Sequence, residues 1–369
     1  MAPPDEPAAK AASPANPPPE QHSGRRKLWR WVRGLLLVLL LLGVLAGATF
    51  VWFYFSTMGG YYVQKTVVQN LTLPRQTINN VLLHTVSYGD SNTTNVLVLH
   101  DGPGGDMLEM QALLRLRDSF RVVFYDQRGT GLSARVPDSL LTLQQLTNEA
   151  AAVAQHWFGD TATYWVIGQG FGARLALLLS KAVPNQLRGL ILVAPRELHP
   201  DHQAGEATRR QGWAYRRRAF RAWFEQQHIR YKGDPEAPED HYFNRLYPLN
   251  PHYPTCPQLN NRQAMPLWRG GYSAWRCLHS VLFPEGAAIA TDFTTKLPQE
   301  LHPNTRVLAG ACDQRWGPAF QRKQWQPAGL PPENIIALPR CGLHPFREAP
   351  DTTLKAIRAF LRKSMAAKP

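Results

Sequence analysis

The segment 164–177 constrains the fold more than any other part of the chain. An apolar run at 164–167 is followed by the glycine-rich sequence 168–172 and then by a helical pattern at 173–177. A buried strand that enters a helix through a sharp glycine turn is typical of an α/β fold built on a parallel sheet. The middle residue of this turn is Gly170. The sequence therefore indicates a strand–turn–helix unit whose central position has no side chain.

Further strands and helices continue this pattern from residue 78 to the end of the chain. Apolar strands that alternate with helices indicate a parallel sheet covered by helices on both faces. The alternation stops between residues 197 and 300, a block rich in Arg, Trp, Tyr and Pro, which we expect to be an inserted helical cap. The α/β core then comprises 78–196 and 301–369. We expect strands at 78–87, 95–100, 120–125, 164–167, 190–194, 305–311 and 334–339, and helices at 142–158 and 352–363.

A run of 22 residues without a charge, 34–55, lies near the start of the chain. As a helix it would be roughly 33 Å long, enough to cross a bilayer core. Five basic residues precede it between 25 and 33, and aromatic residues flank both ends. This pattern predicts a transmembrane signal anchor with a cytoplasmic N-terminus. Residues 1–33 would form a disordered Pro/Ala-rich tail with a basic end, and 56–77 a juxtamembrane segment.

A cleaved signal peptide is the alternative interpretation of the same run. Residues 46–48 read Ala-Gly-Ala, which resembles a signal cleavage site. Cleavage there would leave a very apolar mature N-terminus, so the uncleaved anchor is preferred. Both interpretations place the main domain outside the cytoplasm, in the periplasm if the organism is a bacterium.

The four cysteines are widely spaced and form no C-x-x-C pair, so we expect no metal site. Export permits disulfides. Cys312 and Cys341 each follow a predicted strand, and neighbouring parallel strands would place them side by side. We predict the pairs Cys312–Cys341 and Cys256–Cys277, with free buried thiols as the alternative.

Three motifs resemble those of the proline iminopeptidase family of α/β-hydrolases. Residues 100–105, His-Asp-Gly-Pro-Gly-Gly, correspond to the family's H-G-G-P-G-G. Residues 126–133 match its D-Q-R-G-x-G-x-S in full, and 168–172 correspond to G-x-S-x-G. The resemblance covers roughly 78–369. It implies an α/β-hydrolase fold and a serine aminopeptidase that uses Ser, His and Asp, with backbone N–H groups as an oxyanion hole.

This chain departs from the family at several of the implied catalytic positions. Gly170 stands at the nucleophile position and has nothing with which to attack. Asp313 stands at the acid position, whereas His344 comes one residue late for the base. The oxyanion hole would use the backbone N–H groups of Gly102 and Phe171.

Asp101 replaces a family glycine directly before the oxyanion loop. A carboxylate about 4 Å from the oxyanion would oppose it by about 4 kcal/mol at an effective dielectric of 20. The alternative, which we expect, is that Asp101 turns away and caps the following helix.

The cap contains an arginine-rich stretch, 209–223, with Trp213, Phe220 and Trp223 near one face of a predicted helix. One interpretation packs these aromatic side chains on the core and leaves the arginines in water. The other is a basic aromatic surface for anionic lipid or an anionic protein partner. The net charge of +14 suits anionic surfaces. We expect no nucleic acid, because the domain is exported.

Together these features predict a membrane-anchored, extracytoplasmic relative of the proline iminopeptidases that is not a catalyst. It would bind a peptide or small molecule in the cleft that corresponds to the family's active site, without a cofactor or metal. The alternative is an active aminopeptidase or esterase in which His344 and Asp313 activate a water molecule in place of the missing serine.

Overall fold

The computed structural model describes residues 22–201, 213–230, 233–247, 267–283 and 291–366. The chain divides into two compact units, Met1–Ser56 and Thr57–Pro369. The first contains helix α1 (His22–Ser56), within which Lys27–Ser56 is long and apolar enough to cross a membrane. An 18-residue stretch of this span has a mean hydropathy of 2.6. A signal sequence meets the same criteria of length and composition.

Helix α1 begins earlier than the sequence predicts. Residues 22–33, expected to be part of a disordered tail, are helical. The last proline before the apolar run is Pro19, and from there on only Gly24 disfavours a helix, so the helix extends back through the basic residues. The remainder of the predicted tail, 1–21, lies outside the described residues.

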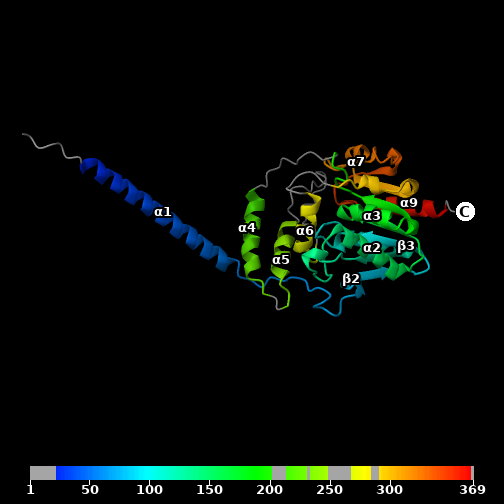
Figure 1. The fold of residues 1–369 in the computed structure, drawn as a ribbon, viewed down its shortest axis with the longest axis horizontal. Helices are drawn as coiled ribbons and strands as arrows, with labels where there is room; N and C mark the ends of the chain where they lie inside the picture. Colours follow the sequence, from blue (N-terminus) through cyan, green and yellow to red (C-terminus); the bar gives the residue numbers. More distant parts are fainter. Residues whose placement is uncertain (1–21, 202–212, 231–232, 248–266, 284–290, 367–369) are drawn as a thin grey trace, which may run out of the picture. The chain divides into compact units, whose positions relative to one another are not determined.

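One sheet of eight strands forms the centre of the second unit, in the order β1-β2-β4-β3-β5-β6-β7-β8. Strands β1, β2 and β4 pair antiparallel at one edge, and β4 through β8 are parallel, which confirms the predicted sheet (Figure 1). The strands are β1 (Arg75–Ile78), β2 (Val81–Tyr88), β3 (Thr94–Leu99), β4 (Phe120–Tyr125), β5 (Tyr164–Gln169), β6 (Leu187–Val193), β7 (Thr305–Gly310) and β8 (Ile335–Leu338).

The predicted first strand, 78–87, covers the last residue of β1, a two-residue turn and most of β2, which together form a hairpin. Asn79 and Asn80 connect β1 and β2 with φ angles of +49° and +61°. A two-residue loop in which both residues have positive φ suits the twist of a hairpin, and asparagine tolerates this conformation better than most residues.

Helices cover both faces of the sheet. Helices α2 (Leu143–Phe158) and α3 (Phe171–Ala182) bury their apolar sides in the core on one face, together with Trp325 of α7 (Pro318–Trp325). The other face packs against the 3₁₀ segment η1 and helices α8 and α9. These three are η1 (Met107–Asp118), α8 (Pro345–Glu348) and α9 (Pro350–Ala366). The described residues also contain the short 3₁₀ turns η2 (Asp138–Leu140), η3 (Pro184–Gln186), η6 (Thr294–Lys296), η7 (Gln299–Asn304) and η8 (Pro332–Asn334).

Three helices lie between β6 and β7, inside the block expected to form the cap. They are α4 (Trp213–Gln227), α5 (Ala237–Leu246) and α6 (Tyr272–Leu282) (Figure 1). Asp240 of α5 is fully buried and accepts hydrogen bonds from Arg269 at 2.7 Å and from Arg135, in the core, at 2.9 Å. This buried ionic group fastens the cap to the loop that follows β4.

Both predicted disulfides are wrong. Cys312 takes part in a disulfide, but Cys341 and Cys277 are free thiols. Strands β7 and β8 are parallel neighbours as predicted, and the Cys312 backbone N–H donates to the Cys341 carbonyl at 2.9 Å. However, the Cys341 side chain packs into the core while Cys312 remains half-exposed, so the two sulfur atoms are not joined. Cys256 lies outside the described residues.

Candidate active site

Gly170 lies in the turn between β5 and α3, at the carboxyl end of the central strands. Its φ of +51° and ψ of −108° form a sharp, left-handed bend. The Gly170 N–H donates to the Val193 carbonyl of the neighbouring strand β6 at 3.0 Å, which ties the turn to the sheet. The backbone therefore has the strained strand-to-helix geometry that presents a nucleophile in an α/β-hydrolase, although no side chain is present here.

The Asp101 carboxylate occupies the space beside this turn. Its Oδ1 accepts hydrogen bonds from the backbone N–H of Gly102 at 2.7 Å and from that of Phe171 at 2.8 Å. These are the two N–H groups expected to form the oxyanion hole. Asp101 is only 5% exposed, so the expectation that it turns away is wrong. The residue that caps η1 is Asp106, whose side chain accepts from the Leu108 N–H.

Arg196 holds the other oxygen of this carboxylate. Its guanidinium lies 2.5 Å from Asp101 Oδ2, and it follows closely after β6. The Arg196 Cζ also lies 5.9 Å from the centre of the Trp316 ring. Two N–H donors and a guanidinium together offset the cost of burying the charge of Asp101. Arg196 was not among the predicted site residues. Its one signal in the sequence was a charged residue near the end of an apolar strand.

His344 points inward and is only 3% exposed. Its Nδ1 lies 2.7 Å from Oε1 of Glu109, a buried residue of η1. The same oxygen accepts from the Gln169 side chain at 2.6 Å. Glu109 thus takes the orienting position expected for Asp313. No sequence motif points to Glu109, because Glu109 and His344 are 235 residues apart.

The environment of His344 favours the imidazolium form. Burial alone would lower its pKa, but the charge and hydrogen bond of Glu109, with the charges of Asp101 and Glu348, raise the pKa above its ordinary value of 6.5. An imidazolium cannot accept a proton from a nucleophile. The pair therefore resembles a structural ion pair more than a poised general base.

Asp313 follows β7 at the position that the resemblance implies. Its Oδ1 accepts hydrogen bonds from the backbone N–H groups of Arg315 at 2.9 Å and Trp316 at 3.0 Å. Within the described residues, these are the donors that the structure gives its carboxylate. Burial raises the pKa of Asp313 above its ordinary value. The structure thus brings Asp313 near His344 without joining the two directly.

Ser133 is the serine of the 126–133 motif, and its hydroxyl already has two partners. It donates to the carbonyl of Asp126 at 2.6 Å and accepts from the His84 N–H at 2.9 Å. The side chain is fully buried beneath the loop. It therefore stabilises the D-Q-R-G loop and does not replace the missing nucleophile.

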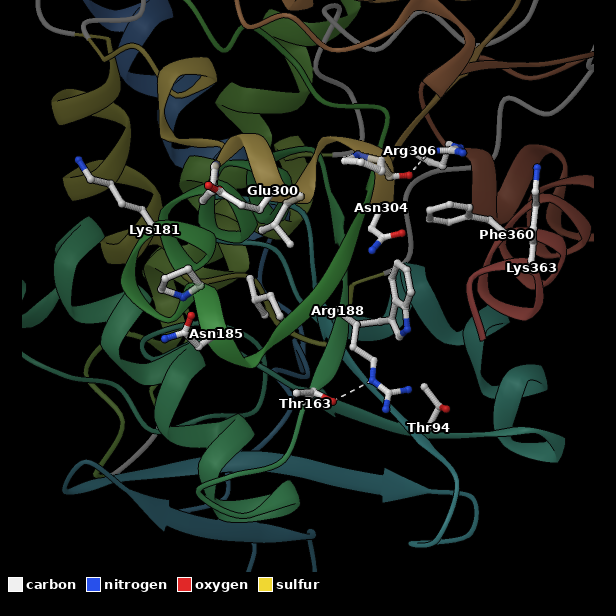
Figure 2. A pocket seen from close by; sticks show the side chains of 16 residues that line it. Thr94, Thr163, Lys181, Asn185, Arg188, Glu300, Asn304, Arg306, Phe360 and Lys363 are labelled. Carbon is white, nitrogen blue, oxygen red and sulfur yellow. Dashed lines mark hydrogen bonds between the residues drawn. The ribbon is translucent and has the colours of Figure 1, made fainter. Parts of the chain in front are cut away.

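A cavity of about 1180 Å³ lies at the opposite end of the sheet. Its walls include Thr94, Thr163 and Leu187, which stand at the amino ends of β3, β5 and β6. Figure 2 shows Arg188 in this cavity, hydrogen-bonded to Thr163 at 2.8 Å. Because these residues lie at the amino ends of the strands and Gly170 follows the carboxyl end of β5, this cavity is separate from the site around Gly170. Ligands of such folds bind at the carboxyl ends.

A family model supports the fold assignment. The model of the alpha/beta hydrolase family matches residues 96–356. The chain belongs to the α/β-hydrolase family. This span includes the H-D-G-P-G-G loop, the elbow, the cap and His344.

Similar curated proteins include proline iminopeptidases. That of Xylella fastidiosa is 31% identical over 123 residues, which cover 32% of this chain and 39% of that protein. That of Thermoplasma volcanium is 30% identical over 115 residues, covering 30% and 38%. The match thus spans about two fifths of the length of these relatives.

Solved structures of the same fold include an esterase from Thermogutta terrifontis, with a TM-score of 0.51, 21% identity and coverage of 79% of this chain and 98% of that chain. A proline iminopeptidase-related protein from Thermus thermophilus has a TM-score of 0.53, 23% identity and coverage of 80% and 98%. At these identities the comparison establishes the fold alone.

Proposed function

We propose that this protein is a membrane-anchored member of the α/β-hydrolase family that binds a ligand in the old active-site cleft without catalysing hydrolysis. One observation carries the proposal: the carboxylate of Asp101 accepts both N–H groups of the oxyanion hole. The proline iminopeptidase motif has a glycine at the position of Asp101. In this chain the Asp101 carboxylate therefore fills the space that a hydrolase leaves open for the reacting oxygen.

Acyl transfer fails here at two separate steps. No side chain at Gly170 can attack a carbonyl, so no covalent intermediate can form there. A tetrahedral oxyanion formed in any other way would need the two donors that Asp101 already uses. Loss of one oxyanion-hole donor lowers kcat by a factor of about 10²–10³. Here both donors are already bound to Asp101. A negative charge in their place adds repulsion to that loss.

Ligand binding is the activity that these changes leave possible. Gly170 and Asp101 lie at the carboxyl ends of β5 and β3, next to the cap-bearing side of the sheet, where ligands of such folds bind. The similarity to proline iminopeptidases favours a peptide or another small molecule as the ligand. Arg196 gives the cleft a cation that pairs with the Asp101 carboxylate.

A second candidate is a hydrolase without the usual serine nucleophile. The buried His344–Glu109 pair favours it, since a carboxylate that orients a histidine is a common arrangement for a general base. The raised pKa of His344 and the occupied oxyanion hole argue against it. Any such activity would depend on His344 and on displacement of Asp101.

Four versions of the full chain test the proposal with aminoacyl-naphthylamide and short-chain ester substrates. We expect no turnover from the natural chain or from Asp101→Gly. Gly170→Ser should turn over substrate much more slowly than the double variant, because its displaced Asp101 carboxylate stays close to the oxyanion and repels it. A fluorophosphonate probe should label the double variant most strongly and the natural chain not at all. Adding His344→Gln to that variant should abolish the gained turnover. His344-dependent turnover by the natural chain would refute the non-catalytic proposal and establish the second candidate.

The anchor is a separate part of the proposal. Helix α1 has the length and hydropathy of a membrane span, with basic residues before it. We expect the full chain to stay in the membrane fraction after alkaline carbonate extraction. Protease added to intact spheroplasts should digest the domain from residue 57 onward if that domain is extracytoplasmic. Release of the domain by carbonate would favour a cleaved signal.

A further inference from the structure

We propose that the outer face of helix α4 lies against an anionic lipid surface. This inference rests on the proposed membrane anchor, and it assigns the cap a contact that the enzyme fold does not require. The outer face of α4 consists of Trp213, Arg216, Arg217, Phe220 and Trp223.

The aromatic side chains of this face point outward. Trp213 is 75% exposed, Phe220 47% and Trp223 44%. The interpretation in which these three pack on the core is therefore wrong. Ala222 is fully buried on the opposite side of the helix. Phe224 is also fully buried, although the helical repeat places it next to Trp213, and its ring packs 5.0 Å from those of Phe220 and Trp223.

The helical repeat gathers these exposed residues on one side. Successive residues are about 100° apart around a helix, which places the three exposed aromatic residues within an arc of about 80°. Arg216 falls inside this arc, and Arg217 lies about 40° beyond Trp213. The Cζ of Arg217 lies 5.8 Å from the centre of the Trp213 ring. Ala222 falls on the opposite side of the helix. A mixed face of aromatic and basic side chains suits the headgroup region of a membrane.

The charge of this face is unbalanced. Glu225 is the only acidic residue within α4, and its side chain is 1% exposed. It is already bound by Arg221 at 2.9 Å, by Arg245 at 3.0 Å and by His241 at 3.1 Å. Arg216 and Arg217 are exposed on the outer face. Arginines next to a membrane are attracted to anionic lipid within about one Debye length of the surface.

The chain itself brings α4 close to the proposed membrane exit. Thr57 is the residue directly after α1, and its hydroxyl lies 3.3 Å from Nε2 of His228, the residue after α4. Thr57 is 2% exposed, so this junction is packed. Helix α4 has 15 residues, so its far end lies within about 22 Å of the junction. If α1 spans the bilayer, the chain connection keeps the His228 end of α4 close to the membrane surface, which favours lipid over a soluble anionic partner.

Hydrogen exchange of the full chain in nanodiscs tests this contact. The discs contain phosphatidylcholine alone or mixed with anionic phosphatidylglycerol, and exchange is followed by mass spectrometry in peptides from 213–227. We expect exchange to be at least about fivefold slower with the anionic lipid, the effect of one arginine at a charged surface. The variant Arg216→Glu with Arg217→Glu should lose this difference. The control, Arg362→Glu with Lys363→Glu on α9, carries the same charge change and should retain it.

The possible outcomes separate this inference from the anchor. If the chain does not insert into nanodiscs, the anchor fails and the inference fails with it. If the chain inserts but exchange in α4 is equal in both lipids, the anchor survives and the inference is refuted. Equal loss in the α9 control would also refute it, because the effect would then come from net charge alone. Protection that requires an added acidic protein rather than anionic lipid would do the same.

Discussion

A side chain at position 170 should destabilise this protein, because Asp101 occupies its place. A Cβ built on Gly170 would lie under 3.0 Å from Oδ1, Cγ and Oδ2 of Asp101, closer than real Cβ atoms approach their neighbours. In Gly170→Ser the carboxylate must therefore leave its two N–H donors and shift against Arg196.

The expected cost follows from the contacts that are lost. Each hydrogen bond to a charged group contributes about 1.5–3 kcal/mol, and the Asp101 carboxylate loses two. A Cβ in the left-handed conformation of Gly170 adds about 1–2 kcal/mol. We expect Gly170→Ser to lower the free energy of unfolding by about 4–8 kcal/mol. The control is Gly159→Ser, since Gly159 also has a positive φ, +95°, but open space around its Cβ position. It should cost only about 1–2 kcal/mol.

A double-mutant cycle separates the collision from the strain. Asp101→Gly and Gly170→Ser both remove the same carboxylate contacts, so the double variant loses them once. It should be more stable than the sum of the single variants implies, by about 3–6 kcal/mol. Urea unfolding of the full chain in detergent, followed by tryptophan fluorescence, measures the four free energies. Additivity within about 0.5 kcal/mol, or equal costs for Gly170→Ser and Gly159→Ser, would refute this account.

Three further predictions concern other parts of the domain. Glu109→Gln should cost about 3 kcal/mol by breaking a buried pair, and should lower the pKa of His344, which NMR titration can follow. In the natural chain the raised pKa of His344 stabilises the fold fully below pH 6.5, and this stabilisation is lost as the pH rises through the folded-state pKa. The urea midpoint of unfolding should therefore fall over that pH range. Glu109→Gln should remove this pH dependence of the midpoint. Alkylation without reductant should modify native Cys277 but reach Cys341 only after denaturation, as peptide mass spectrometry would report, because Cys341 is buried and free. Asn80→Gly should raise the unfolding free energy by a few tenths of a kcal/mol or more in the same urea assay, because glycine adopts the φ of +61° without a Cβ penalty.

Local sequence patterns determined the architecture of this protein. The apolar runs at 120–125 and 305–311 predict strands that the structure places at Phe120–Tyr125 and Thr305–Gly310. Such runs are readable because strand and helix depend on neighbours along the chain. The same locality made Gly170 recognisable as the bend between a strand and a helix.

The tertiary structure decided which side chains meet inside the site. Asp101 could have capped a helix, as its sequence position suggests, but the fold brings Phe171 to it across 70 residues and Arg196 across 95. Glu109 reaches His344 across 235 residues, and Cys341 faces the core rather than its neighbour Cys312. These outcomes depend on side-chain direction and burial after the strands have assembled. The energy of a buried charge is set by donors that sequence spacing does not reveal.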